Sequence, residues 1–177
     1  KNDADSMRIE LASNLGNRPN PGNIQGYDDE TKVVVLQSLF QGSPERGAAI
    51  AADLLKRGST PSKRVKEAAI SLLGQHQSKS STDLLKEVIR SETDPQLRKS
   101  AIFWIGQTSD ESVLDLLKDL ATTSTENEVN KAAVFAISQH RSTRAGALLS
   151  ELARSATSRR VREEAIFWLG QRGGDTV

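Results

Sequence analysis

Side chains able to act as acids, bases or ligands recur along the chain in groups about one repeat apart. Asp83, Asp115 and Glu151 are the carboxylates of these groups that could act in catalysis. A carboxylate becomes an effective catalytic acid or base where its surroundings shift its pKa, and the sequence shows no such neighbour. Because basic residues are interleaved with the acids, the groups could equally form a protein-binding surface or a solvated face held by salt bridges. The candidate partner-binding residues are Lys56, Asp83, Lys86, Glu87, Arg90, Asp115, Lys118, Asp119, Glu151 and Arg154.

The two histidines, His76 and His140, do not form a metal site or a catalytic pair. They occupy equivalent positions two repeats apart, which in a helical stack means a separation on the order of 20 Å, whereas a zinc–imidazole bond is about 2 Å long. The chain has no cysteine, so thiolate ligands and disulfides are also excluded. Phosphate-loop, H-E-x-x-H and G-x-S-x-G motifs are absent as well. The sequence therefore predicts no metal and no cofactor, with both histidines in surface turns.

Three phenylalanines form a second candidate contact feature. Phe103, Phe135 and Phe167 recur at the same helical position, about 240° around the helix from the start of its apolar stripe. They either pack on the next repeat or remain as an exposed aromatic row that contacts a partner. Trp104 and Trp168 instead lie inside the stripe, where we expect them to pack in the core.

An arginine cluster at Arg159, Arg160 and Arg162 suggests a third possibility. Helix N-termini and guanidinium groups both favour phosphate. No aromatic residue is interleaved for base stacking, however, and the net charge of +1 gives no general attraction to nucleic acid. Binding of a phosphate backbone is therefore an alternative, and nucleic acid is not the expected partner.

A repeated motif positions all of these residues. It reads A-I-S-L-L-G-Q from Ala69, A-I-F-W-I-G-Q from Ala101, A-V-F-A-I-S-Q from Ala133 and A-I-F-W-L-G-Q from Ala165, so that the copies start 32 residues apart. A period of this length is typical of stacked helical repeats. The glutamines that end the copies are expected to bond between neighbouring repeats. They are Gln41, Gln75, Gln107, Gln139 and Gln171.

Each repeat is predicted to contain two amphipathic helices, helix A and helix B. In helix A, Ala69, Leu72 and Leu73 form one apolar stripe at 100° per residue. Asp94 and Pro95 form a typical helix start, with a capping side chain and a proline at the first helical position. The predicted organisation is an N-terminal helix and irregular Gly/Asn/Pro loop over residues 1–30, followed by a repeat domain over 31–177. Its repeats span 31–60, 61–92, 93–124 and 125–156, with a half repeat at 157–173.

The start of helix A carries the pattern that resembles a known family. Residues 94–101 (D-P-Q-L-R-K-S-A) follow the D-P-x-V-R-x-x-A start of HEAT repeats, and residues 161–165 (V-R-E-E-A) match its second half. The chain resembles the HEAT-repeat superfamily over about residues 31–173, in particular its phycobilisome-lyase-like short repeats and bacterial HEAT-repeat proteins. The resemblance implies an all-α, right-handed α-solenoid of antiparallel helix pairs with helix B on the concave face. It also implies an Asp–Arg ladder between repeats, in which Asn130 replaces one arginine.

Composition and resemblance together favour a non-enzymatic scaffold that binds a protein or peptide through the concave helix B face. Hydrophobic residues are 36% and aromatic residues 4% of the chain, and no apolar run approaches the roughly 18 residues that suggest a membrane span. The alternatives are a lyase-like or glycosylase-like enzyme that uses Asp83, Asp115 and Glu151, or phosphate-backbone binding by the arginine cluster. The sequence predicts a soluble protein. It leaves open the partner, the oligomeric state, whether the chain is part of a larger protein, and whether it works in the cytoplasm or, after removal of a signal, in the periplasm or outside the cell.

Overall fold

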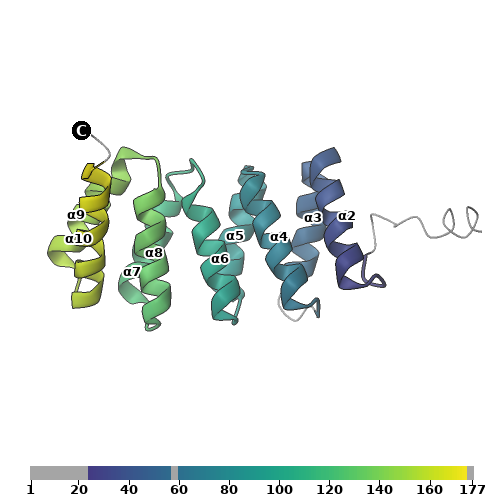
Figure 1. Cartoon of the computed structure of the whole chain (residues 1–177), viewed down its shortest axis with the longest axis horizontal. Coiled ribbons are helices and arrows are strands. Elements are labelled where there is room, and N and C mark those ends of the chain that lie inside the picture. Colours follow the sequence, from purple (N-terminus) through teal and green to yellow (C-terminus); the bar gives the residue numbers. More distant parts are fainter. Residues whose placement is uncertain (1–23, 57–59, 175–177) are drawn as a thin grey trace, which may run out of the picture.

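The structure is a stack of antiparallel helix pairs (Figure 1). This computed structural model describes residues 24–56 and 60–174. Within these ranges it contains nine α-helices and no strand. The predicted N-terminal helix and most of its loop lie outside the described residues. The expected all-α solenoid is confirmed.

The helices form two layers. Layer A consists of α2 (Asp29–Gly42), α4 (Lys63–Gln75), α6 (Pro95–Gly106), α8 (Asn127–Gln139) and α10 (Arg159–Gly174). Layer B consists of α3 (Pro44–Leu55), α5 (Lys79–Ser91), α7 (Val113–Thr123) and α9 (Thr143–Ser155). From α4 onward the layer A helices begin 32 residues apart, at residues 63, 95, 127 and 159. In Figure 1 layer A faces the viewer and its helices stand side by side along the long axis.

Side-chain caps define where many of these helices begin. Asp28 accepts a hydrogen bond from the backbone N–H of Thr31 (2.9 Å) at the start of α2. Asp94 accepts from the N–H groups of Gln96 (2.8 Å) and Leu97 (3.3 Å) at the start of α6. Such bonds satisfy donors that the first helical turn leaves open. The cap and proline at Asp94 and Pro95 therefore start a helix as the sequence predicted.

The core runs between the layers and consists of the small and branched residues of the repeated motif. Ala101, Ile102 and Ile105 of α6 are fully buried, and the corresponding residues of α4 and α8 are buried in the same way. Because each repeat covers the next, the core is continuous along the stack, as expected for a solenoid. Of the apolar stripe predicted for helix A, Ala69 and Leu73 are buried and Leu72 is half-buried, while Ile70, which was not part of that stripe, is also buried.

Layer A is the more closely packed of the two layers. A Cβ atom on Gly106 would lie 2.9 Å from the Cα atom of Ala136 in the next layer A helix, so that α6 and α8 are in near backbone contact. Neighbouring layer B helices touch less, and an apolar cleft of about 300 Å³ separates Leu55 of α3 from Leu84 and Val88 of α5. The small residues of the motif therefore bring the helices of layer A together.

Candidate partner-binding surface

An aromatic ladder crosses three helices of layer A. It consists of Phe103 and Trp104 on α6, Phe135 on α8, and Phe167 and Trp168 on α10. The Phe103 and Phe135 rings stack with their centroids 6.4 Å apart, and Phe135 contacts Trp168 at 4.9 Å. Phe167 then meets Trp168 edge-on at 5.0 Å. The 32-residue period thus places aromatic rings of successive repeats in contact.

The phenylalanines of the ladder face outward, whereas the tryptophans anchor it. Phe103 is 40% exposed and Phe167 54%, with Phe135 half-buried between them. Trp104 and Trp168 are half-buried against the core, as expected from their place in the apolar stripe. Trp168 Nε1 donates a hydrogen bond to Glu164 Oε1 (3.1 Å). The sequence left open whether the phenylalanine row packs on the next repeat or is exposed. In the structure its rings contact one another and remain partly open to solvent.

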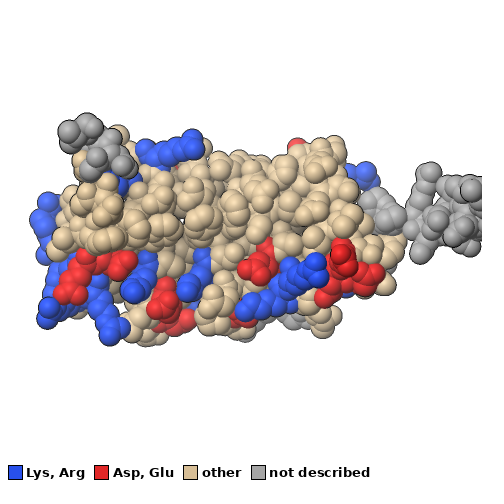
Figure 2. Space-filling model, viewed as in Figure 1, with Lys and Arg blue, Asp and Glu red and all other residues tan. Residues whose placement is uncertain are grey.

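The face of layer A is divided lengthwise by charge. Figure 2 shows lysine, arginine, aspartate and glutamate gathered along the N-terminal halves of these helices, while the C-terminal halves form a nearly uncharged band. Phe103 and Phe167 belong to the C-terminal halves of α6 and α10. Ile166 (58% exposed) lies beside Phe167 in the chain, whereas Val34 (54%) is exposed on α2, at the other end of the stack. Large exposed apolar patches on a folded protein mark contact sites.

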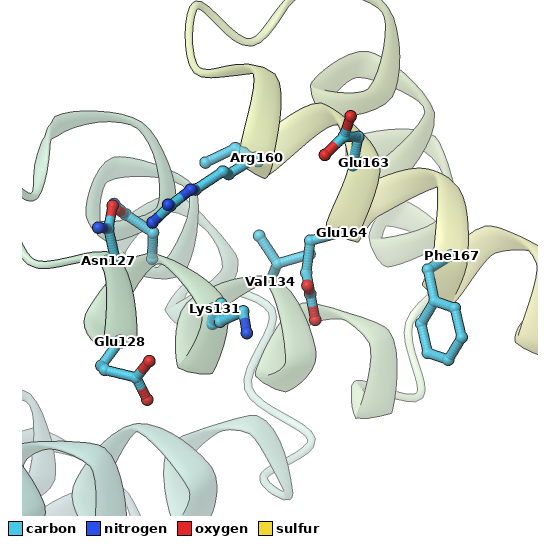
Figure 3. Close-up of a pocket in the computed structure, with 10 residues that line it drawn as sticks. Asn127, Glu128, Lys131, Val134, Arg160, Glu163, Glu164 and Phe167 are labelled. Atoms are coloured by element: carbon cyan, nitrogen blue, oxygen red, sulfur yellow. The ribbon is translucent and has the colours of Figure 1, made fainter.

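A cleft of about 510 Å³ lies between α8 and α10 and adjoins the ladder at Phe167. Figure 3 shows Lys131 of α8 and Glu164 of α10 pointing into it, and Arg160 reaching from α10 toward Asn127 of α8. This cleft was not among the features predicted from the sequence. Its residues come from two repeats, and only the stacking of α8 on α10 brings them together.

The predicted partner-binding residues of helix B are divided among separate helices, and several of them form ion pairs. Lys118 Nζ lies 2.7 Å from Glu151 Oε1, and Arg144 lies 2.7 Å from Asp115. Each of these pairs links one repeat to the next. Lys56 follows α3; Asp83, Lys86, Glu87 and Arg90 lie on α5; Asp115, Lys118 and Asp119 on α7; Glu151 and Arg154 on α9.

The three carboxylates considered for catalysis do not share a site. Asp83 is exposed and lies 3.9 Å from Lys86, while Asp115 and Glu151 each pair with a base of a different repeat. Lys86 also lies 3.7 Å from Asp110. Asp115 and Glu151 therefore join neighbouring repeats, whereas Asp83 pairs within α5.

His140 is buried, so its predicted place at the surface was wrong. Its side chain lies between two loops, with Nε2 3.3 Å from the carbonyl oxygen of Asp110 and Nδ1 accepting from the N–H of Ser142 (3.2 Å). Burial lowers the pKa of His140 below its usual value. His76 is half-buried and stacks on Phe40 with ring centroids 5.0 Å apart. The sequence pattern missed these environments because the contacts come from other repeats.

The glutamine row does not make the predicted bonds between repeats. Gln75 and Gln171 are exposed, and Gln139 donates to Ser138 beside it. The bonds come from other residues: Gln77 donates to the carbonyl oxygen of Gln107 (3.1 Å), and Arg172 to those of Ser138 (2.6 Å) and His140 (3.0 Å). These donors satisfy carbonyl groups at the ends of α6 and α8, as the glutamines were expected to do.

Residues at the arginine position of the D-P-x-V-R-x-x-A pattern donate hydrogen bonds to carbonyl oxygens at the C-terminal ends of layer B helices. Arg98 Nε donates to the Ile89 carbonyl oxygen (3.2 Å), and Arg98 also pairs with Glu126 of the next repeat (2.5 Å). The amide nitrogen of Asn130 lies 2.9 Å from the Leu120 carbonyl oxygen and 3.1 Å from that of Ser124. Asn130 thus replaces the arginine's hydrogen bonds without its charge.

The arginine cluster on α10 is divided among three tasks. Arg159 pairs with Glu163 (2.7 Å), while Arg162 donates to the carbonyl oxygen of Ala156 (2.6 Å). Arg160 alone extends to the cleft beside α8. The three guanidinium groups therefore do not converge on one phosphate.

Within residues 24–56 and 60–174, no group of three or more histidine, aspartate or glutamate side chains could hold a metal ion. None of the helices in the same ranges is long and apolar enough to cross a membrane.

The comparisons with known proteins agree with the fold. The family model for HEAT repeats matches residues 82–170, from α5 into α10, which is half of the chain. No match was found among the curated proteins. HEAT repeats generally serve as scaffolds for protein interactions. The chain belongs to the HEAT-repeat family.

Proposed function

We propose that this protein is a non-enzymatic scaffold that binds a protein partner through the aromatic ladder on the face of layer A. The observation that carries the proposal is the continuous ring contact from Phe103 through Phe135 to Trp168, open to solvent at Phe103 and Phe167. Exposed aromatic side chains held in place by their neighbours are typical centres of protein interfaces, because they bury a large area at little cost in conformational entropy.

The packing of the layers supports this choice over the helix B face. In a curved stack of two layers, the layer whose neighbouring helices lie closer together is on the inner, concave side. The near contact of Gly106 with Ala136 favours layer A as that side, and concave surfaces are those that solenoids use for binding. We therefore place the partner on layer A, where the sequence had suggested helix B.

The charges of layer B also favour this assignment. Lys118 and Glu151, like Arg144 and Asp115, compensate each other at 2.7 Å. Exposed ion pairs of this kind contribute little free energy to binding. The uncharged half of layer A, in contrast, offers apolar area without the cost of removing water from charges (Figure 2).

Site-specific photo-crosslinking tests the proposal. A photoreactive phenylalanine analogue is placed at Phe103 or Phe167 on layer A, with Glu87 or Asp119 on layer B as matched exposed controls. In cells that express the protein, irradiation is expected to give the same protein adduct from both layer A positions and none from layer B. Adducts from layer B alone would place the partner on the opposite face and contradict the proposal.

A further inference from the structure

The cleft between α8 and α10 contains charges of both signs, but they differ in whether they are already paired. Among its carboxylates, Glu128 lies 3.3 Å from Lys99 and Glu163 lies 2.7 Å from Arg159. Glu164 accepts the hydrogen bond of the Trp168 indole. All three carboxylates of the cleft are thus held by donors of the protein itself.

The two cations of the cleft have no such partner. In the described part of the chain, neither Lys131 nor Arg160 lies within ion-pair distance of a carboxylate, and both are exposed. They approach from opposite sides, one from α8 and one from α10 (Figure 3). An anionic group between them would complete the pairing of charges in the cleft.

One exposed aromatic residue joins the cleft to the ladder. Phe167 lines the cleft and contacts Trp168 of the ladder at 5.0 Å, while Val134, which also lines the cleft, is fully buried. A volume of about 510 Å³ is at the small end of the range for ligand pockets. It accommodates one or two side chains rather than a folded element.

We infer that the partner binds as a short segment in which an aspartate or glutamate stands next to an aromatic or long aliphatic residue. The carboxylate lies between Lys131 and Arg160, and the apolar side chain packs on Phe167 and the ladder. This inference rests on the proposed function and specifies the chemistry of its partner.

A peptide carboxylate fits the cleft better than a nucleic-acid backbone does. A phosphate backbone presents a continuous row of negative charges, and Glu128, Glu163 and Glu164 line the walls on both sides. These carboxylates would repel the phosphates that flank any one bound between the cations. A single carboxylate next to an apolar side chain meets no such row.

Random-peptide phage display with the whole chain tests the inference. Peptides are selected on the wild-type protein. Two versions of a selected peptide are then titrated, one with its acidic residue intact and one with that residue changed to glutamine. The fluorescence of Trp104 and Trp168, the only tryptophans of the chain, reports binding at the ladder. Selected peptides are expected to contain Asp or Glu beside Phe, Tyr, Trp or Leu, and the glutamine version is expected to bind roughly tenfold more weakly.

A charge-reversed variant provides the matched control. Lys131→Glu combined with Arg160→Glu is expected to weaken the acidic peptide at least tenfold, and raised salt is expected to weaken its binding to the wild type. Arg90→Glu combined with Arg154→Glu makes the same change of charge on layer B and is expected to have little effect. Circular dichroism checks that both variants keep their helices, since all four side chains are exposed.

The possible results separate the inference from the function on which it rests. Selected peptides without acids that still require Phe103 and Phe167 would overturn the inference and leave the scaffold proposal standing. Peptides that bind equally to a Phe103→Ser/Phe167→Ser variant, or no selected peptide at all, would contradict both. Retention of DNA at low salt that disappears in the Lys131→Glu/Arg160→Glu variant would assign the cations to nucleic acid and overturn the inference.

Discussion

The indole of Trp104 lies against Gly74 of the preceding layer A helix, where a Cβ atom would come within 2.6 Å of the Trp104 Cβ. Trp104 can enter the stack because the residue opposite it has no side chain. In the next layer A helix, α8, Ala136 occupies the position of the tryptophan. A Cβ atom on Gly106 of α6 would collide with the backbone of Ala136. The two glycines thus admit either a large ring or the backbone of the next helix, and the contact of Trp104 with Gly74 holds the base of the aromatic ladder.

Gly74→Ala is therefore expected to destabilise the protein. The new methyl group meets the Trp104 Cβ and ring atoms close to the backbone, so that the collision is relieved only by moving α6. Overpacking of this kind costs roughly 1–3 kcal/mol. Urea denaturation followed by circular dichroism measures the loss.

Gly146→Ala is the matched control for this substitution. Gly146 lies inside α9 with nothing within 4 Å of the position of its Cβ. Alanine there is expected to raise the free energy of unfolding by about 0.5–1 kcal/mol, since glycine is the poorer helix former. Equal effects of the two substitutions would mean that the contact with Trp104 does not restrict residue 74.

Asn130→Ala is expected to lower stability by roughly 1–3 kcal/mol. It removes the donors to the carbonyl oxygens of Leu120, Ala121 and Ser124 at the end of α7. Asn130→Arg restores the side chain that other repeats use for this task, as Arg98 and Arg162 do, and is expected to keep most of the stability. Thermal unfolding of both variants tests this. If the arginine variant is as unstable as the alanine variant, arginine and asparagine are not equivalent at residue 130.

Stability is expected to fall as the pH decreases through about 6.5 because His140 is buried without its proton. Its pKa is lowered in the folded state, chiefly by burial, so that the unfolded chain binds more protons in this range. Protonation would also place a hydrogen on Nδ1, which accepts from Ser142.

A His140→Gln variant separates this effect from other titrating groups. The difference in unfolding free energy between pH 7.5 and pH 5.5 is expected to be larger for the wild type than for the variant. Urea titrations at the two pH values give this difference for each protein. If the two proteins respond identically to pH, His140 does not contribute to the dependence.

The features that follow from local pattern were predictable from the sequence, and those that depend on neighbouring repeats were not. The helical spacing of apolar residues and the helix start at Asp94 and Pro95 placed the helices correctly, because both signals depend on residues within one helix. The environment of His140 depends on Asp110 of the previous repeat.

The same limit applies to the candidate site. The 32-residue period identified the phenylalanines as one row, but their exposure depends on what the next repeat covers. Phe135 is half-buried because it lies between Phe103 and Trp168, while Phe167 is exposed. The cleft between Lys131 and Arg160 has no linear motif, since the two residues belong to different repeats.

The most direct test is the affinity of the wild type and of matched surface variants for the partner that photo-crosslinking identifies. Calorimetry measures each affinity. Phe103→Ser combined with Phe167→Ser removes the exposed rings of the ladder, and removal of aromatic contacts at the centre of an interface costs about 2 kcal/mol or more, which is roughly 30-fold in affinity. Glu87→Ser combined with Asp119→Ser on layer B is expected to change the affinity less than about twofold. Full affinity in the ladder variant, with loss in the layer B variant, would contradict the account.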